Sequence, residues 1–222
     1  MSLFSKFNRS ISFQEYADSY GLTRAGLNAE ICRITRERLQ AGDLVFVLPQ
    51  FPSTFLQIQA AFDQRDVDYR VQATPLDENQ LEELISENHG REAILTLAEM
   101  LQKFPVAKLP YSSKISASVI VTERHPLGAK DESISAAARR LPLPTRLGFF
   151  LALDDPLLKP VNGDWVGSLL RTLGATETEL ISSHMVSKRI RSLQRRIQAT
   201  AKSDKPADSA DHWMAINTTF KK

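Results

Sequence analysis

Residues 114–125 read KISASVIVTERH, and the fold prediction starts from this stretch. Its apolar run, residues 119–121, is typical of a strand that is buried on both faces. Four polar residues, Thr122 to His125, follow the run without a break. Ligand crevices of parallel sheets lie beyond the carboxyl ends of the strands. The stretch therefore predicts a buried parallel strand with a polar site at its end.

Segments on both sides extend this pattern into alternating strands and helices. The predicted strands are 43–49 (DLVFVLP), 68–73 (DYRVQA), 114–123 and 146–155 (RLGFFLALDD), the last ending at Asp154 and Asp155. The predicted helices are 54–65, 77–104 with a break at Gly90, and 131–141. Strands that alternate with helices predict an α/β domain with a parallel sheet covered by helices on both faces.

Both ends of the chain read as helical. Residues 13–40 have apolar positions at helical spacing, with breaks at Gly21 and Gly26, and the pattern from Trp165 onward is purely helical. The polar tail is expected to be flexible, although Trp213, Met214 and Ile216 offer apolar side chains for docking. The predicted divisions are a helical segment at 1–41, the α/β domain at 42–160, a helical extension at 161–202 and the tail at 203–222.

Composition limits the classes of function. A hydrophobic content of 42% in 222 residues supports a packed core, and a net charge of +2 excludes steering of the whole molecule toward polyanions. The single cysteine, Cys32, forms neither an internal disulfide nor a thiolate cluster, and its place in a helical pattern favours a buried small hydrophobe. No run approaches the ~20 apolar residues of a membrane span, and the N-terminus lacks a secretory signal, so we expect a cytoplasmic protein.

Motifs for self-sufficient catalysis are missing from the sequence. There is no G-x-x-x-x-G-K-[ST] loop, no dinucleotide fingerprint and no G-x-S-x-G elbow. The four histidines lack metal-ligand spacing. We therefore expect no metal, no cofactor and no ATPase activity of the chain alone.

Residues 122–158 resemble, without a gap, the second motor domain of the SecA preprotein translocase ATPase family. The family motif is T-E-R-H, five residues, then aspartate, and a later strand that ends in acidic residues. Residues that fall on these positions are Thr122, Glu123, Arg124, His125, Asp131, Leu153, Asp154 and Asp155. Further segments resemble the same family in the same order, namely 42–71, 88–93 (NHGREA), 163–174 and 182–197, so the resemblance covers most of residues 42–198.

The resemblance implies a RecA-like α/β domain with an α-helical C-terminal extension. It also implies a nucleotide-site remnant, composed of Thr122, Glu123, Arg124, His125, Asp131 and Arg140. The family's R-G-R-x-G-R stretch is here Ser135 to Arg140, in which only Arg140 keeps an arginine position. The family's glycine-rich loop is replaced by residues 103–115, which contain no glycine. An arginine at such a site can contribute ~10³ to 10⁵ in rate, so these departures predict a chain without enzymatic activity.

Two interpretations remain open for each part of the remnant. Residues 122–125 either form a contact surface at the crevice or, as we favour, hold the strand-to-helix turn through a local pair of Glu123 and Arg124. Arg140 either completes a partner's ATP site in trans or, as we favour, is an exposed arginine on an amphipathic helix.

The basic helix predicted in residues 179–202 is the candidate partner-binding element. Its cationic residues are Lys188, Arg191, Arg195 and Arg196, and its apolar positions, expected to dock on the sheet domain, are Met185, Ile190, Leu193 and Ile197. A stripe of cations can bind phosphates, but no aromatic residues interleave for base stacking. A solvated basic face or an acidic protein partner is favoured.

These observations predict an accessory or regulatory binding module of preprotein translocation. Its partner would be a translocase component, an ATPase or a client polypeptide. One alternative is a nucleic-acid-associated, helicase-like module, supported only by the basic helix. Another is a subunit that completes a partner's ATPase site through Arg140.

Overall fold

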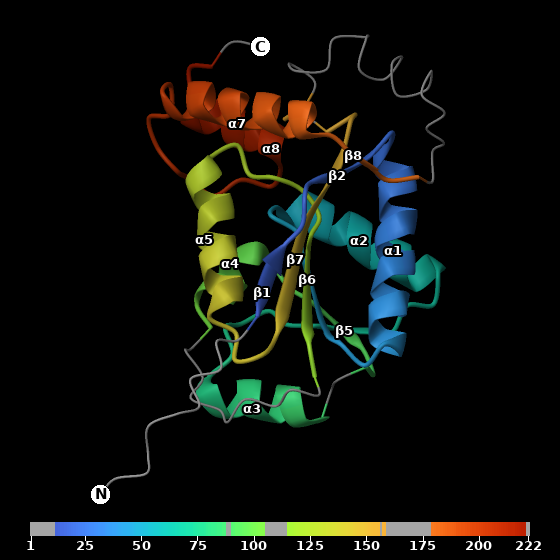
Figure 1. Cartoon of the computed structure of the whole chain (residues 1–222). Coiled ribbons are helices and arrows are strands. Elements are labelled where there is room, and N and C mark those ends of the chain that lie inside the picture. The colour runs from blue at the N-terminus through green and yellow to red at the C-terminus, as the bar shows by residue number, and fades with distance from the viewer. Residues whose placement is uncertain (1–11, 88–89, 105–114, 156, 159–178, 221–222) are drawn as a thin grey trace, which may run out of the picture.

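The computed structural model describes residues 12–87, 90–104, 115–155, 157–158 and 179–220 of the chain (Figure 1). Eight strands in these residues form one sheet. Its main path is β4 (Tyr69–Val71), β5 (Ala93–Leu95), β3 (Leu44–Leu48), β6 (Ala117–Val121), β7 (Thr145–Ala152), β2 (Ser19–Gly21) and β8 (Ile181–Ser182). β1 (Phe13–Glu15) pairs with the first half of β7. All pairs are parallel except β2 with β8, which confirms the predicted sheet.

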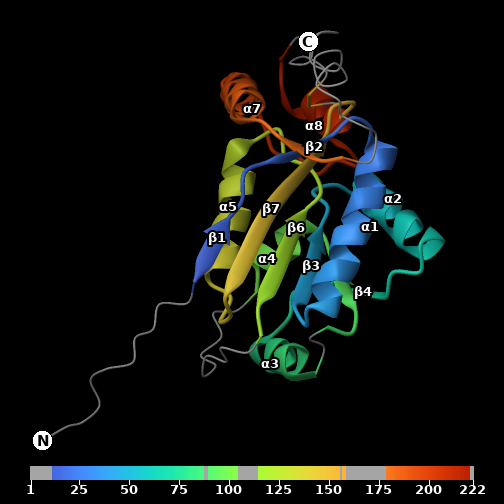
Figure 2. The same cartoon turned by 45° about the vertical axis from the view of Figure 1, so that its right-hand side comes forward.

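Helices cover both faces of this sheet, as Figure 2 shows. One face packs on α1 (Arg24–Gln40) and α2 (Pro52–Gln64), and the other on α3 (Glu78–Glu87), α4 (Ala98–Gln102) and α5 (Gly128–Arg139). The strand LVFVL of β3 is buried throughout because its alternating side chains enter two different hydrophobic clusters. The arrangement is an α/β fold consistent with the RecA-like class.

Two C-terminal helices complete the described structure and lie across one end of the sheet (Figures 1 and 2). They are α7 (His184–Gln198) and α8 (Ala210–Asn217). Ile190, Leu193 and Ile197 of α7 are buried in the main cluster, so the expected docking of this helix is confirmed for them. Met185 was wrongly placed on the docked face, since it is 54% exposed. The neighbouring predicted helix at 165–174 lies outside the described residues.

Three predictions of local structure are wrong. The short helix before Gly21 is instead β1 and β2, which pair with β7. The helical prediction across 77–104 missed β5, whose three residues are fully buried between β3 and β4. The tail is not flexible across residues 210–217, because α8 buries Trp213 and Met214 in the core. The divisions of the chain into domains stay predictions.

Candidate functional site

Arg124 lies just beyond the carboxyl end of β6 and is buried in a network of acidic side chains. Its Nη2 donates to Asp18 Oδ1 at 2.6 Å, its Nε to Asp18 Oδ2 at 3.3 Å, and its Nη1 to Asp131 Oδ2 at 3.0 Å. The guanidinium carbon lies 3.9 Å from the centroid of the Phe149 ring. Asp18, Arg124 and Asp131 are each at most 7% exposed. A buried charge needs such compensation, because desolvation without a partner costs several kcal/mol.

Asp131, in the first turn of α5, joins four elements of the structure. Its Oδ1 accepts from the backbone N–H of His125 at 3.0 Å and from Gln50 Nε2 at 2.8 Å. Its Oδ2 accepts from Gln194 Nε2 of α7 at 2.7 Å, in addition to Arg124. Gln194 Nε2 also lies 2.8 Å from the carbonyl oxygen of His125. Burial raises the pKa of Asp131, while these donors and the guanidinium oppose the rise.

The network continues from Asp18 to the basic helix. The hydroxyl of Tyr20 donates to Asp18 Oδ2 at 3.0 Å and lies 2.7 Å from Ser187 Oγ of α7. Burial, together with the charge of Asp18, raises the pKa of Tyr20, so this phenol stays protonated. Tyr20 and Gln194 thus link two points of α7 to the polar centre.

Glu123 caps the turn that leads into α2 rather than pairing with Arg124. Its Oε1 accepts from the backbone N–H groups of Gln50 and Phe51, at 3.1 and 3.2 Å. Burial raises the pKa of Glu123 to about 7. The local Glu123–Arg124 pair expected from the sequence is therefore wrong, because each side chain bonds to a different element.

Thr122 is held from the N-terminal part of the chain. Arg24 of α1 donates to the Thr122 carbonyl oxygen at 2.8 Å and forms an ion pair with Asp155, which follows β7. The second carboxylate oxygen of Asp155 accepts from the Ala152 backbone N–H at 3.0 Å. The Thr122 hydroxyl is buried and has no hydrogen-bond partner in the described part of the chain. Arg24 thereby connects the ends of β6 and β7.

His125 is packed between two aromatic rings. Its ring stacks on Phe51 with centroids 5.1 Å apart and meets Trp213 of α8 edge-on, also at 5.1 Å. Its Nδ1 accepts from the Leu127 backbone N–H at 2.9 Å. Burial lowers the pKa of His125 to about 4, so the imidazole is neutral near pH 7. This histidine serves as a packing element for the C-terminal helix.

The structure therefore brings together five of the six predicted remnant residues, Thr122 to His125 and Asp131, but not Arg140. Arg140 is the C-cap of α5, and its exposed side chain donates to the Gln102 carbonyl oxygen at 3.1 Å. Along α5, Arg140 lies nine positions after Asp131 of the network, which is a rise of about 14 Å. Residues 122–125 are buried, and Arg124 also lines a neighbouring groove, so their interpretation as a contact surface at the crevice stays a prediction.

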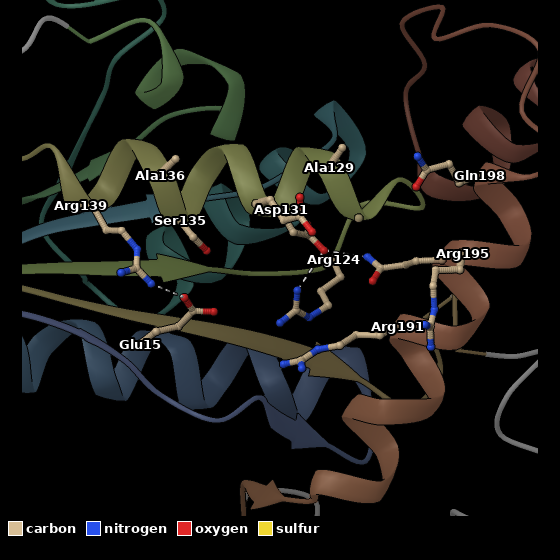
Figure 3. Close-up of a pocket in the computed structure, with 13 residues that line it drawn as sticks. Glu15, Arg124, Ala129, Asp131, Ser135, Ala136, Arg139, Arg191, Arg195 and Gln198 are labelled. Atoms are coloured by element: carbon tan, nitrogen blue, oxygen red, sulfur yellow. Dashed lines mark hydrogen bonds and ion pairs between the residues drawn. The ribbon is translucent and has the colours of Figure 1, made fainter.

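A groove of about 780 Å³ opens beside the buried network, between α5, α7 and β1 (Figure 3). Its lining includes two of the predicted partner-binding residues, Arg191 and Arg195, which are both exposed. Arg139 of α5 lies over the Phe13 ring at 4.2 Å and 3.8 Å from Glu15. Lys188 and Arg196 are exposed on α7 but do not line this groove.

Sequence reasoning missed Asp18, Tyr20 and Arg24 as parts of the site. These residues precede the predicted α/β domain, which begins at residue 42, by 18 to 24 positions, and their segment read as helical. The one available signal was the run ADSYG, in which a polar pair and a glycine interrupt the helical spacing. The residues that they contact lie far along the chain, and the sequence shows those residues only as a motif at the end of a strand.

The residues that the structure describes contain neither a metal-binding cluster nor a membrane-spanning helix. No group of three or more His, Cys, Asp or Glu side chains is arranged to hold a metal ion. No described helix is long and apolar enough to cross a membrane. The prediction of a cytoplasmic location stays a prediction.

The chain is an α/β domain with a polar site at a strand end, and comparison with known proteins adds one partial similarity. A stretch of 81 residues, 36% of this chain, is 33% identical to the protein translocase subunit SecA of Xanthomonas campestris pv. campestris (strain B100). The SecA subunit of Xanthomonas oryzae pv. oryzae (strain PXO99A) matches equally well. The match spans only 9% of the length of either relative.

Other comparisons add little. No protein-family profile matches the chain. Among solved structures, the C-terminal part of the Fun30 ATPase domain aligns with 70% of this chain and 48% of its own length, with 9% identity and a TM-score of 0.36. The chain is thus partly similar to SecA.

Proposed function

We propose that this chain is a non-catalytic, SecA-like binding module that contacts a polypeptide partner in protein translocation. The partner is a translocase component, another ATPase or a client polypeptide. The similarity to translocase subunits supports the pathway. The observation that carries the non-catalytic part is the closed network around Arg124, whose guanidinium donors go to the carboxylates of Asp131, also in the remnant, and of Asp18.

A working phosphoryl-transfer site needs cations that face an open crevice, where the transferred group develops its charge. Arg124 is 7% exposed, and Asp18 and Asp131 take up its donors. Arg140 is held away at the opposite end of α5. Since the 222 residues also contain no P-loop pattern, the strand-end motif acts in folding and in placing α7 rather than in hydrolysis.

The binding part of the proposal rests on the surface of α7. Gln194 and Ser187 fix one face of this helix to the polar network, and Ile190, Leu193 and Ile197 fix it to the core. The opposite face presents exposed cations to solvent. A rigidly held row of cations binds without the entropy cost of ordering a loose segment.

Two measurements on the purified full chain test this function. The first is ATP turnover and ATP affinity by calorimetry. We expect no turnover and a dissociation constant for ATP in the millimolar range or weaker. The second is interferometry against a purified SecA translocase and against an unfolded secretory precursor, for which we expect saturable binding to at least one. Turnover that persists in a clean preparation would exclude the non-catalytic role. Absence of binding to both probes would exclude the translocation role.

A further inference from the structure

The groove between α5, α7 and β1 contains cations without partners. Arg191 and Arg195 lie one helical turn apart on α7, and both line the groove. Neither side chain forms an ion pair or hydrogen bond within the described residues. Figure 3 shows Arg191 extending from α7 toward the side of the groove where Arg124 lies. These two guanidinium groups are therefore available to an anionic ligand.

The rest of the lining combines small residues with acidic ones. Gly128, Ala129, Ser135 and Ala136 line the side formed by α5, and their short side chains leave room for a polypeptide backbone. Glu132 and Glu15 also line the groove, on α5 and β1. The side facing α7 has mixed charge, because Arg139 and Arg124 also line the groove and Arg139 lies 3.8 Å from Glu15. Glu132 adds a further carboxylate on this side.

We propose that this groove binds an extended polypeptide segment that carries acidic residues at alternate positions. The proposal rests on the function proposed above and specifies the partner's chemistry. Residues four apart on a helix have Cβ atoms roughly 5–6 Å apart, and alternate residues of an extended chain lie roughly 6.6 Å apart on one face. One carboxylate can therefore reach Arg191 while the other reaches Arg195. Guanidinium groups favour such pairing because their planar donors match a carboxylate.

A polypeptide fits this groove better than a nucleic acid does. None of the described lining residues is aromatic, so the stacking platforms typical of single-strand binding sites are missing. Glu132 would repel a continuous phosphate backbone, whereas a peptide can place a neutral or basic residue beside it. The volume of about 780 Å³ lies within the roughly 300–1,000 Å³ of ligand sites, which suits a short segment.

The test uses the full chain and a fluorescein-labelled Ser-Asp-Ser-Asp-Ser peptide, with binding measured by anisotropy at low and at moderate salt. The double variant R191E/R195E should weaken binding by at least about tenfold, because each exposed ion pair contributes roughly up to fivefold and reversal adds repulsion. The matched control K188E/R196E makes the same charge change on α7 outside the groove and should stay within about threefold of the wild type. Glu132→Lys should tighten binding several-fold, which an unfolded variant would not do.

Competition identifies the ligand class. A peptide of equal charge with adjacent aspartates should compete less well than the alternating one, and inorganic phosphate, ATP and single-stranded DNA should compete only weakly. Equal losses in the two double variants, no binding by the wild type, or stronger competition by any phosphate ligand would each overturn the groove proposal. Binding to SecA or to the precursor is measured separately, so its retention after failure of the peptide assay would reject the groove and keep the proposed function.

Discussion

Replacing Arg124 with methionine tests whether the strand-end motif is structural. Methionine keeps an unbranched apolar stem but removes the guanidinium group, with its contact to Phe149 and its three hydrogen bonds to buried carboxylates. Breaking a buried ion pair by removing one partner costs about 3–5 kcal/mol. For a chain of this size each kcal/mol lowers the melting midpoint by about 2–4 °C, so we expect a decrease of roughly 6–20 °C.

The structure also predicts which of the two carboxylates is left with fewer hydrogen bonds in this variant. Without Arg124, Asp131 keeps donors from His125, Gln50 and Gln194. Within the described residues, the Asp18 carboxylate keeps only the hydrogen bond from the Tyr20 hydroxyl. Adding Asp18→Asn to the R124M variant should therefore recover more stability than adding Asp131→Asn.

Urea unfolding followed by circular dichroism measures these differences, and Arg140→Met is the matched control. Arg140 is exposed, so its loss should cost no more than about 0.5 kcal/mol. An R124M variant as stable as the wild type, or one that Asp18→Asn fails to improve, would refute the assignment of the network to folding.

Three further predictions concern neighbouring parts of the site. Burial raises the pKa of Glu123 from 4.5 to about 7, so the folded state holds this proton more tightly and Glu123 lowers stability as pH rises through that interval. The urea midpoint of Glu123→Gln should therefore rise relative to that of the wild type between pH 5 and pH 8. Parallel pH profiles of the two proteins would contradict this. Asp155→Asn leaves the partly buried Arg24 without its anion and should lower the free energy of unfolding by about 1–3 kcal/mol. This loss should be at least as large as that caused by replacing the half-buried Phe150 with alanine. An Asp155→Asn variant as stable as the wild type would show that the ion pair contributes nothing to stability. Trp213→Ala should cost about 3–5 kcal/mol and expose the amides of α8 to hydrogen exchange, and unchanged protection would mean that this helix does not pack on His125.

Three of the four strands that sequence analysis identified correctly share one property, while the fourth, β4, has three residues that are partly or fully exposed. β3, β6 and β7 are runs of five to eight residues with large apolar side chains, so burial on both faces is visible in composition alone. β5 has only three residues and lies between two helices in the chain, and its apolar run AIL fits a helical pattern equally well. Short buried strands are therefore the predictable failures of this reasoning.

The candidate site was predicted in position but not in role. Parallel strands end at one edge, so the placement of residues 122–125 there followed from chain order. Their burial did not, because it depends on α7 and α8 covering that edge. The role of Asp155 could not be predicted for the same reason, since its partner Arg24 lies 131 positions away.

The sequence by itself determined the α/β class, the parallel sheet and the amphipathic character of α7, because the spacing of apolar residues shows locally which side chains are buried. Tertiary structure alone decided that Arg124 pairs with Asp18, 106 positions away, and that Gln194 joins Asp131, 63 positions away. Periodicity specifies that a side chain is buried but not which group meets it. That choice depends on strand register and helix docking, and these decide whether a strand-end arginine faces an open crevice or closes a buried network.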